Sequence, residues 1–283
     1  MNKKVCVVVP VFNHLEETKR FIIDFKNNTY SNYTIVIVND ASKDGTSDYL
    51  KTNFPEVVVV EGNGDLWWSG GTNEGVKYAM QKGFDYVLTI NNDSETDKNM
   101  LSNLINCAGE NPESIIGARV MLAHTNKIWA LGVLVLFKQF PFLNLNYYGE
   151  DESIIHQITN PLMVQALAGN GVLVPIEVFK KIGFYDYKWC PQYHGDTEFT
   201  YRATKNGIKC LVESTAVVYN NNFDPDPKYG FWEELFSKKS GHFWRPFFLF
   251  YIKYVPLKYK PFLFKQFTWI PKRILKEIHK RLM

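Results

Sequence analysis

The feature that most constrains the fold is a continuous apolar run near the start of the chain. Residues 5–11 read VCVVVPV, with valine at five of the seven positions. Such a run is typical of a strand that is buried on both faces, as in parallel sheets covered by helices on each side. The apolar spacing of residues 15–25 predicts the first of those covering helices.

The alternation of strands and helices continues through the first 110 residues and then becomes less regular. We predict strands at residues 33–38, 57–60, 86–90, 128–137 and 208–212 and another after Gly171, loops at 62–71 and 140–151, and helices that end near Leu50 or cover 72–81, 97–108, 176–182 and 195–206. Thr72 or Asn73 is expected to cap the helix at 72–81. This order implies right-handed crossovers and a mostly parallel sheet.

Polar side chains follow the first four predicted strands. In chain order these side chains are Asn13, Asp40, Asp65 and Asp93. Open parallel sheets bind ligands at the carboxyl ends of their strands. We therefore expect a ligand site along this edge of the sheet, with the four residues beside it.

Composition and charge limit the possible classes of protein. Hydrophobic residues make up 46% of the 283 residues and charged residues 22%, which indicates a folded protein with a sizeable core. Residues 238–283 contain nine Lys, three Arg and one acidic residue, a net charge of +11, whereas residues 1–237 carry −8. A basic end on an acidic body points to an anionic surface such as phospholipid or nucleic acid.

The sequence shows no pattern of a zinc site, a signal peptide or a membrane span. The four cysteines form no Cys-x-x-Cys pair, so we expect cytosolic thiols rather than zinc ligands. The N-terminal apolar run ends at Pro10 without a small-residue cleavage site. No stretch reaches 18 uninterrupted apolar residues, so we expect no transmembrane helix.

Four motifs occur in order along the chain: VVVPVFN, IVIVNDASKDGTSDYL, TINNDSETD and HGDTEFTYR. Together, from about Val5 to about Val218, they resemble the family 2 glycosyltransferases, the inverting enzymes with a GT-A fold. The stretch GDLWWSGGTNEG is similar to the corresponding loop of the bacterial rhamnosyltransferase-like branch. The resemblance implies an α/β GT-A fold with a mostly parallel central sheet flanked by helices.

In this family the acidic residue after the second strand contacts the nucleotide, and the resemblance assigns that role to Asp40. Its carboxylate would accept a hydrogen bond from a base N–H or a ribose hydroxyl. Pro10, Phe12 and Asn13 would line the same pocket. From position alone, Asp40 is equally suited to capping the turn before Ser42.

The triplet Asn91-Asn92-Asp93 stands where the family keeps its DxD-type motif. In such enzymes a divalent cation neutralises the leaving diphosphate. We assign Asp93 to Mg²⁺ or Mn²⁺ and Asn92 to the donor, because one Asp suffices when phosphates and waters supply the other ligands. Asn91 replaces the first acid, so a turn that binds nothing is the alternative.

The glycine-rich stretch GNGDLWWSGG is expected to wrap the donor. Asp65 would accept hydrogen bonds from sugar hydroxyls, and Gly71 would let the backbone approach the sugar-phosphate. Adjacent residues usually point different ways, so one of the two tryptophans is expected to stack on a sugar and the other to fill the core. We place Trp67 on the donor side and Trp68 on the acceptor side.

Asp196 corresponds to the catalytic base of the family. Inverting transfer is a single displacement in which the acceptor hydroxyl loses its proton to a carboxylate. Gly195 replaces the first acid of the family's pair, and an N-cap role for Asp196 is compatible with a base role. We place three further residues on the acceptor side: Asn170, His194 and Glu198.

We divide the chain into a catalytic domain, residues 1–237, and a basic aromatic tail, residues 238–283. Residues 1–110 would bind the nucleotide sugar and residues 111–237 the acceptor. Aromatic and cationic side chains alternate in the tail, which suits the headgroup interface of an anionic membrane. A lid packed on the catalytic domain is the alternative.

The resemblance implies transfer of a sugar from dTDP-rhamnose or a UDP-hexose to a hydroxyl of a glycan or lipid-linked acceptor. Bacterial surface polysaccharide synthesis at the inner face of the cell membrane would fit this reaction. Two alternatives are a nucleotidyltransferase, which would need a basic glycine-rich loop where this chain has VFNH, and an inactive nucleotide-sugar-binding protein. Nucleic acid is not expected as a partner, because it does not account for the aspartates at the sheet edge.

Overall fold

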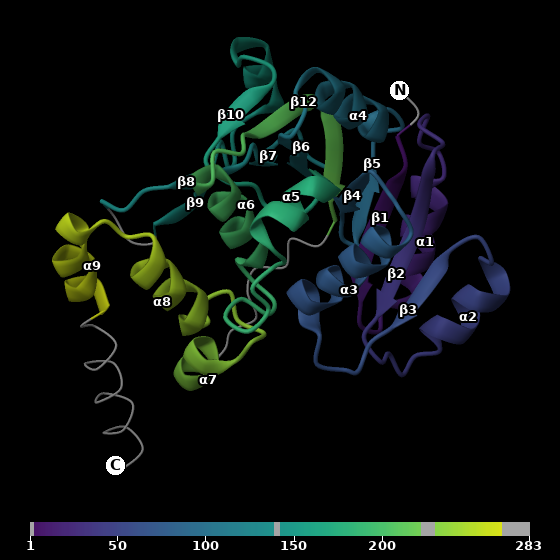
Figure 1. Cartoon of the computed structure of the whole chain (residues 1–283), viewed down its shortest axis with the longest axis horizontal. Helices are drawn as coiled ribbons and strands as arrows, with labels where there is room; N and C mark the ends of the chain where they lie inside the picture. Colours follow the sequence, from purple (N-terminus) through teal and green to yellow (C-terminus); the bar gives the residue numbers. More distant parts are fainter. Residues whose placement is uncertain (1–2, 139–141, 222–229, 268–283) are drawn as a thin grey trace.

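The computed structural model describes residues 3–138, 142–221 and 230–267. Figure 1 shows a twisted central sheet with helices on both faces. In chain order the elements are β1 (Val5–Val11), α1 (Leu15–Phe25), β2 (Tyr33–Asn39), α2 (Thr46–Asn53), β3 (Val58–Glu61), α3 (Trp67–Gln81), β4 (Tyr86–Thr89), β5 (Ser94–Thr96), α4 (Met100–Glu110), β6 (Ile115–Leu122), β7 (Ile128–Ala130), β8 (Val133–Val135), β9 (Leu143–Leu145), η1 (Glu152–Gln157), β10 (Leu162–Val164), β11 (Val172–Pro175), α5 (Ile176–Ile182), α6 (Gly195–Lys205), β12 (Cys210–Asn220), α7 (Phe231–Phe236), α8 (Trp244–Lys253), η2 (Leu257–Tyr259) and α9 (Lys260–Phe267).

The main sheet has the strand order β10-β12-β6-β11-β4-β1-β2-β3, with β5 on β12 and β7 on β6. The run β4-β1-β2-β3 is parallel, and so is the pair β6-β12. Strand β11 lies antiparallel between β4 and β6 and joins the two parallel parts. The expected α/β class with a large, mostly parallel central sheet is confirmed.

Burial on both faces explains the apolar run of β1. Val5, Val7 and Val9 pack into one core with helices α1, α2 and α4, whereas Cys6 and Val8 pack into the other with α3, α5 and α6. All five side chains are fully buried. Each successive side chain therefore meets an apolar layer, and a polar residue is tolerated only where the strand ends.

Helix α3 corrects one prediction. It begins at Trp67, so the second half of the expected glycine-rich loop is helical, and Thr72 and Asn73 are buried inside the helix rather than capping it. Gly71 serves helix packing: a Cβ there would lie 3.0 Å from Cβ of Pro10 in β1. The helix therefore lies close against the sheet, and Gly71 is not exposed to a ligand.

Two expectations in the second half need correction as well. The expected loop at 140–151 contains β9, which pairs with β8, and the single strand expected at 128–137 is divided into β7 and β8. Gly132, with φ of 79°, makes the turn between them. Strand β12 extends to Asn220 because it follows β6 in parallel register past a bulge between Glu213 and Val217.

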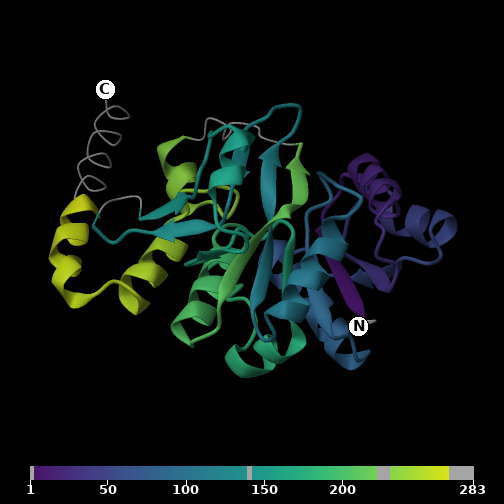
Figure 2. The ribbon, with the colours of Figure 1, turned by 90° about the horizontal axis from the view of Figure 1, so that it is seen from above.

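The C-terminal helices pack on the rest of the protein. Phe247 and Phe250 of α8 are buried together with Phe142 and with Tyr201 of α6 in a third apolar cluster. Figures 1 and 2 place α8 and α9 at the opposite end of the molecule from α1 and α2. Within the described residues, no helix has both the length and the apolar character needed to cross a membrane.

Candidate active site

A cavity of about 580 Å³ lies at the carboxyl ends of β1, β2 and β4. Small-molecule sites typically occupy about 300–1,000 Å³. Seven of the residues predicted for the site line it: Pro10, Phe12, Asp40, Trp67, Trp68, Asn92 and Asp93. The cavity is therefore where the polar ends of the parallel strands predicted a ligand site.

The loop after β1 is fixed by a polar turn rather than by a ligand contact. The backbone N–H of Asn13 donates to Oγ of Ser42 at 2.7 Å, and its side-chain oxygen accepts from the N–H of Lys43 at 2.9 Å. Asp44 in the same turn accepts from the N–H groups of Leu15 and Thr46. Asn13 thus supports the cavity wall from outside and does not line it.

The carboxylate of Asp40 holds the loop that follows β3. Oδ1 accepts from the N–H of Gly64 at 2.7 Å, and Oδ2 accepts from those of Leu66 and Trp67 at 2.9 and 3.1 Å. The turn before Ser42 is capped instead by Asn39, whose Oδ1 accepts from the Ser42 N–H. Asp40 therefore caps α3 from a distance while it also lines the cavity.

The turn after β4 carries the candidate metal residue. Asp93 lines both the main cavity and a smaller one of about 250 Å³ beside it. Oδ1 of Asn91 accepts from Nε1 of Trp68 at 3.0 Å, and Nδ2 of Asn92 donates to Oγ1 of Thr18 at 3.0 Å. Across the described ranges, no group of three His, Cys, Asp or Glu residues is arranged to hold a metal.

A one-carboxylate cation site fits this arrangement. Mg²⁺ and Mn²⁺ keep several waters and commonly bind through one or two carboxylates together with substrate phosphates. Asp93 would supply the carboxylate of such a site, while Glu95, the next acid, accepts instead from Nδ2 of Asn221 at 3.0 Å. Waters and the phosphate oxygens of a bound ligand would have to complete the coordination of such a cation.

The three groups Trp68, Gly169 and Asp196 meet beside the cavity. A Cβ on Gly169 would lie 2.7 Å from the Trp68 ring and 2.8 Å from Cβ of Asp196. The carboxylate of Asp196 accepts from the N–H of Gly169 at 2.6 Å and from that of Thr197 at 2.6 Å. The orientation of Asp196 is thus fixed by both oxygens: one is hydrogen-bonded to Gly169, and the other is hydrogen-bonded to Thr197 at the start of α6.

Asn170 lies behind the turn after β4 and does not reach the cavity. Its buried Oδ1 accepts from the N–H of Asn91 at 3.2 Å, and its Nδ2 donates to Oγ of Ser94 at 2.9 Å. The expected acceptor-side role is therefore not what the geometry offers. Asn170 instead fixes the backbone at Asn91, two residues before Asp93.

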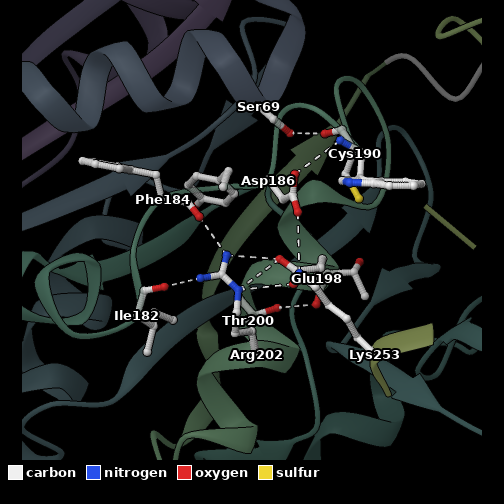
Figure 3. Close-up of polar contacts among 12 residues, drawn as sticks. Ser69, Ile182, Phe184, Asp186, Cys190, Glu198, Thr200, Arg202 and Lys253 are labelled. Carbon is white, nitrogen blue, oxygen red and sulfur yellow. Dashed lines mark hydrogen bonds and ion pairs between the residues drawn. The ribbon is translucent and has the colours of Figure 1, made fainter. Parts of the chain in front are cut away.

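Glu198 is fully buried in an ion pair and cannot meet an acceptor, so its predicted acceptor-side role is wrong. Its carboxylate pairs with Arg202 at 3.1 Å and accepts from the hydroxyl of Tyr254 at 2.6 Å. Figure 3 shows Arg202 also turned toward the carbonyl groups of Ile182 and Phe184. Burial and the Glu198 charge raise the pKa of Tyr254. The network ties α6 to α8.

His194 stands in a left-handed conformation with φ of 64°, directly before α6. Its Nε2 donates to the carbonyl oxygen of Gly241 at 3.2 Å, and its ring packs edge-on against Phe247 at 5.0 Å. Burial lowers the pKa of His194, although the charge of Asp196 acts in the opposite direction. The side chain thus links the start of α6 to the C-terminal segment rather than facing the cavity.

Asp65 lies at the rim of the cavity and is exposed. Its Oδ1 accepts from Nε1 of Trp67 at 2.7 Å and from Nζ of Lys238 at 2.8 Å. The hydrogen bond from Lys238 lowers the pKa of Asp65. Both tryptophans line the cavity, so the expected division into one ligand-facing and one core tryptophan is wrong, although Trp68 also packs on the core.

Sequence reasoning did not select several residues that line the cavity. Asn91 and His14 lie within motifs that were considered, and Gln192 and Tyr193 directly precede His194. Lys239 is the unexpected member, because its charge was assigned to the membrane-facing tail. No local pattern places it at the cavity, since only the packing of the C-terminal segment brings it there.

The fold is that of the GT-A glycosyltransferases. It is similar to GalNAc-T7, solved with UDP, GalNAc and Mn²⁺, with a TM-score of 0.62 and 17% identity over 78% of this chain and 44% of that one. It is also similar to mannosyltransferase PcManGT from Pyrobaculum calidifontis, solved with GDP-Man and Mn²⁺, with a TM-score of 0.55 and 14% identity over 81% of this chain and 59% of that one. The chain thus spans about half the length of these two proteins.

The model of glycosyl transferase family 2 matches residues 6–166, more than half of the chain. The chain belongs to this family. It is 23% identical over 219 residues to uncharacterized proteins of Mycobacterium tuberculosis and Mycobacterium bovis, covering 77% of this chain and 73% of theirs. The matched region includes Asp40 and Asp93 at the cavity and ends before Asp196 in α6.

Proposed function

We propose that this protein transfers a sugar from a nucleotide-diphosphate donor to a hydroxyl acceptor with inversion. The observation that carries the proposal is the cavity that gathers Asp40 and Asp93 at the ends of parallel strands, with Asp196 held next to Trp68 at its side. The complexes of the two similar structures, one with UDP and GalNAc and the other with GDP-Man, support a donor of this class. The rhamnosyltransferase-like loop favours dTDP-rhamnose or a UDP-hexose.

In the proposed reaction, Asp196 takes the proton of the acceptor hydroxyl as the hydroxyl attacks the anomeric carbon. The bond from that carbon to the diphosphate breaks in the same step, and the nucleoside diphosphate leaves. Both oxygens of Asp196 accept a backbone N–H, and Oδ1 also accepts from Oγ1 of Thr197 at 3.3 Å, so Oδ2 is the oxygen that keeps a further lone pair for a substrate proton. The backbone contacts hold the carboxylate in one orientation. Asp93 would hold a Mg²⁺ or Mn²⁺ ion, which when bound neutralises charge on the diphosphate.

The acceptor is proposed to be a glycan or lipid-linked glycan used in bacterial surface polysaccharide synthesis at the inner face of the membrane. Apolar side chains on the outer side of the C-terminal helices support membrane contact. Ile252 of α8 is 52% exposed and Leu257 of η2 is 81% exposed, close to Lys258 in sequence. Exposed apolar groups beside cations suit an anionic bilayer surface. This contact is compatible with the packing of Phe247 and Phe250 on the opposite side.

Asp196→Asn tests the chemistry once the donor is found by a thermal-shift screen of nucleotide sugars with Mn²⁺, Mg²⁺ or a chelator. We expect donor affinity to be kept and turnover to fall about 10²–10⁴-fold, as for loss of a general base. Because both carboxylate oxygens accept N–H groups, an amide must oppose one of them, at a stability cost of about 1–3 kcal/mol.

Glu177→Gln, at an exposed acid in the first turn of α5, is the matched control and should leave turnover unchanged. Turnover of Asp196→Asn within a few-fold of the parent would assign the base elsewhere. A wild-type protein that binds a nucleotide sugar and neither transfers nor hydrolyses it would instead support the inactive binding protein.

A further inference from the structure

A positively charged side chain lines the main cavity, and it does not come from the motifs at the ends of the parallel strands. Lys239 is the single lysine or arginine among the described residues that line the cavity, which otherwise carries the carboxylates of Asp40 and Asp93. We propose that Lys239 binds the diphosphate of the donor and that residues 237–241 are built into the site to hold it there. This inference rests on the proposed function and names a further binding residue for it.

The residue before Lys239 is anchored to the rim of the cavity. Nζ of Lys238 lies 2.8 Å from Oδ1 of Asp65 and 5.3 Å from the centre of the Trp67 ring. Nε1 of Trp67 donates to the same Asp65 oxygen at 2.7 Å. Lys238, Asp65 and Trp67 therefore form one polar and aromatic contact that joins the C-terminal segment to the loop held by Asp40.

The chain is anchored again two residues after Lys239. The carbonyl of Gly241 accepts from Nε2 of His194 at 3.2 Å. Ser240 is buried, and its N–H donates to the carbonyl of Ser237 at 3.2 Å. With at most about 3.3–3.6 Å of chain per residue, the backbone of Lys239 cannot move far from the cavity while both anchors hold.

The positive charge of Lys239 also suits a diphosphate. A departing nucleoside diphosphate concentrates negative charge, and positive groups fixed at that position stabilise it. The described residues offer Asp93 as a metal carboxylate but no group of three ligands around it. Lysine binds phosphate as a compact point charge. Lys239 would therefore neutralise part of the charge of the diphosphate, together with a cation bound at Asp93.

Lys239→Gln tests this assignment by calorimetry with UDP, GDP and dTDP, each compared with its nucleoside, in Mn²⁺ and in chelator. Lys181→Gln, at an exposed lysine of α5 outside the cavity, is the control. We expect Lys239→Gln to weaken binding of the diphosphate about 10-fold or more, in line with loss of a hydrogen bond to a charged group. Binding of the nucleoside should be unchanged, as should all binding by Lys181→Gln.

The outcomes separate this inference from the proposed function. Diphosphate affinity of Lys239→Gln within two-fold of wild type would overturn the role of Lys239 and leave the glycosyltransferase proposal intact. Equal loss of nucleoside and diphosphate affinity would also overturn it, because it would show a general collapse of the cavity. A wild-type protein that binds none of the three diphosphates would overturn the proposed function, and this inference with it.

Discussion

Replacing Gly195 by alanine tests the packing that places Asp196. An added Cβ would overlap Oγ of Ser69 and would lie 3.0 Å from the carbonyl oxygen of Cys190. Oγ of Ser69 donates to that same carbonyl at 2.5 Å, and Ser69 is fully buried on α3. The hydroxyl therefore cannot turn away from a new methyl group without losing its hydrogen bond. The same overlap explains why an acidic side chain does not fit at Gly195.

The expected cost follows from two effects. Overpacking a close-packed interior costs about 1–3 kcal/mol, and loss of the Ser69 hydrogen bond adds about 0.5–1.5 kcal/mol. We expect Gly195→Ala to lower the free energy of unfolding by about 2–4 kcal/mol. For a protein of this size, that corresponds to a decrease in Tm of roughly 3–7 °C. Gly195→Asp should cost more, because it also buries a second carboxylate beside Asp196.

Thermal unfolding of a double-mutant cycle measures the effect. In a Ser69→Ala background the overlapping hydroxyl is absent, and the nearest atoms to the new Cβ are the Cys190 oxygen and Cβ of residue 69, which lies 3.4 Å away in the wild type. The alanine at 195 should then cost at least about 1 kcal/mol less than in the wild type. Strictly additive losses, or a wild-type Tm for Gly195→Ala, would refute this account of the packing.

Three further predictions follow from the site and the C-terminal helices. Asp93→Ala should abolish the Mn²⁺-dependent part of nucleoside diphosphate binding in calorimetry; unchanged metal dependence would contradict its assignment as the metal carboxylate. Ile252→Glu, at a half-exposed position of α8, should change stability by no more than about 0.5 kcal/mol and reduce co-sedimentation with anionic liposomes, whereas unchanged co-sedimentation would exclude this surface as the membrane contact. Burial lowers the folded-state pKa of His194, so as the pH is lowered the unfolded chain takes up a proton before the folded protein does. The free energy of unfolding therefore decreases as pH falls below the ordinary pKa of 6.5. The ring of His194 faces the charges of Asp196 and His242, and His194→Asn, which tolerates the left-handed backbone, should show a smaller loss of unfolding free energy between pH 7.5 and pH 5; equal losses would disprove the effect.

Local patterns predicted the parallel half of the fold because they depend on neighbouring residues. The valines of β1 alternate between two cores, so a run of consecutive apolar residues is enough to predict that both faces of the strand are buried. The start of α3 was misplaced because its cap, Asp40, lies in the loop after another strand. Propensity alone favours a loop at Gly70 and Gly71, whereas the structure shows that the close approach of α3 to Pro10 of β1 is what favours glycine at position 71.

The same distinction applies to the candidate site. Asp40 and Asp93 were predicted because the end of a parallel strand fixes where such a residue lies. Glu198 was predicted to lie on the acceptor side, but its environment is set by Arg202 and by Tyr254 at the end of a distant helix. Lys239 could not be predicted, since its place at the cavity depends on contacts made by residues on either side of it.

The three hydrogen bonds accepted by Asp40 also bear on how this region opens in solution. The amides of Gly64, Leu66 and Trp67 depend on one carboxylate, so none of them is released singly without leaving that buried acid partly unsatisfied. Hydrogen exchange at these amides should therefore be correlated and should follow the opening of the end of β2 rather than the fraying of a surface loop. The entrance to the cavity would then open as one cooperative unit, on a timescale that mass spectrometry can follow separately from catalysis.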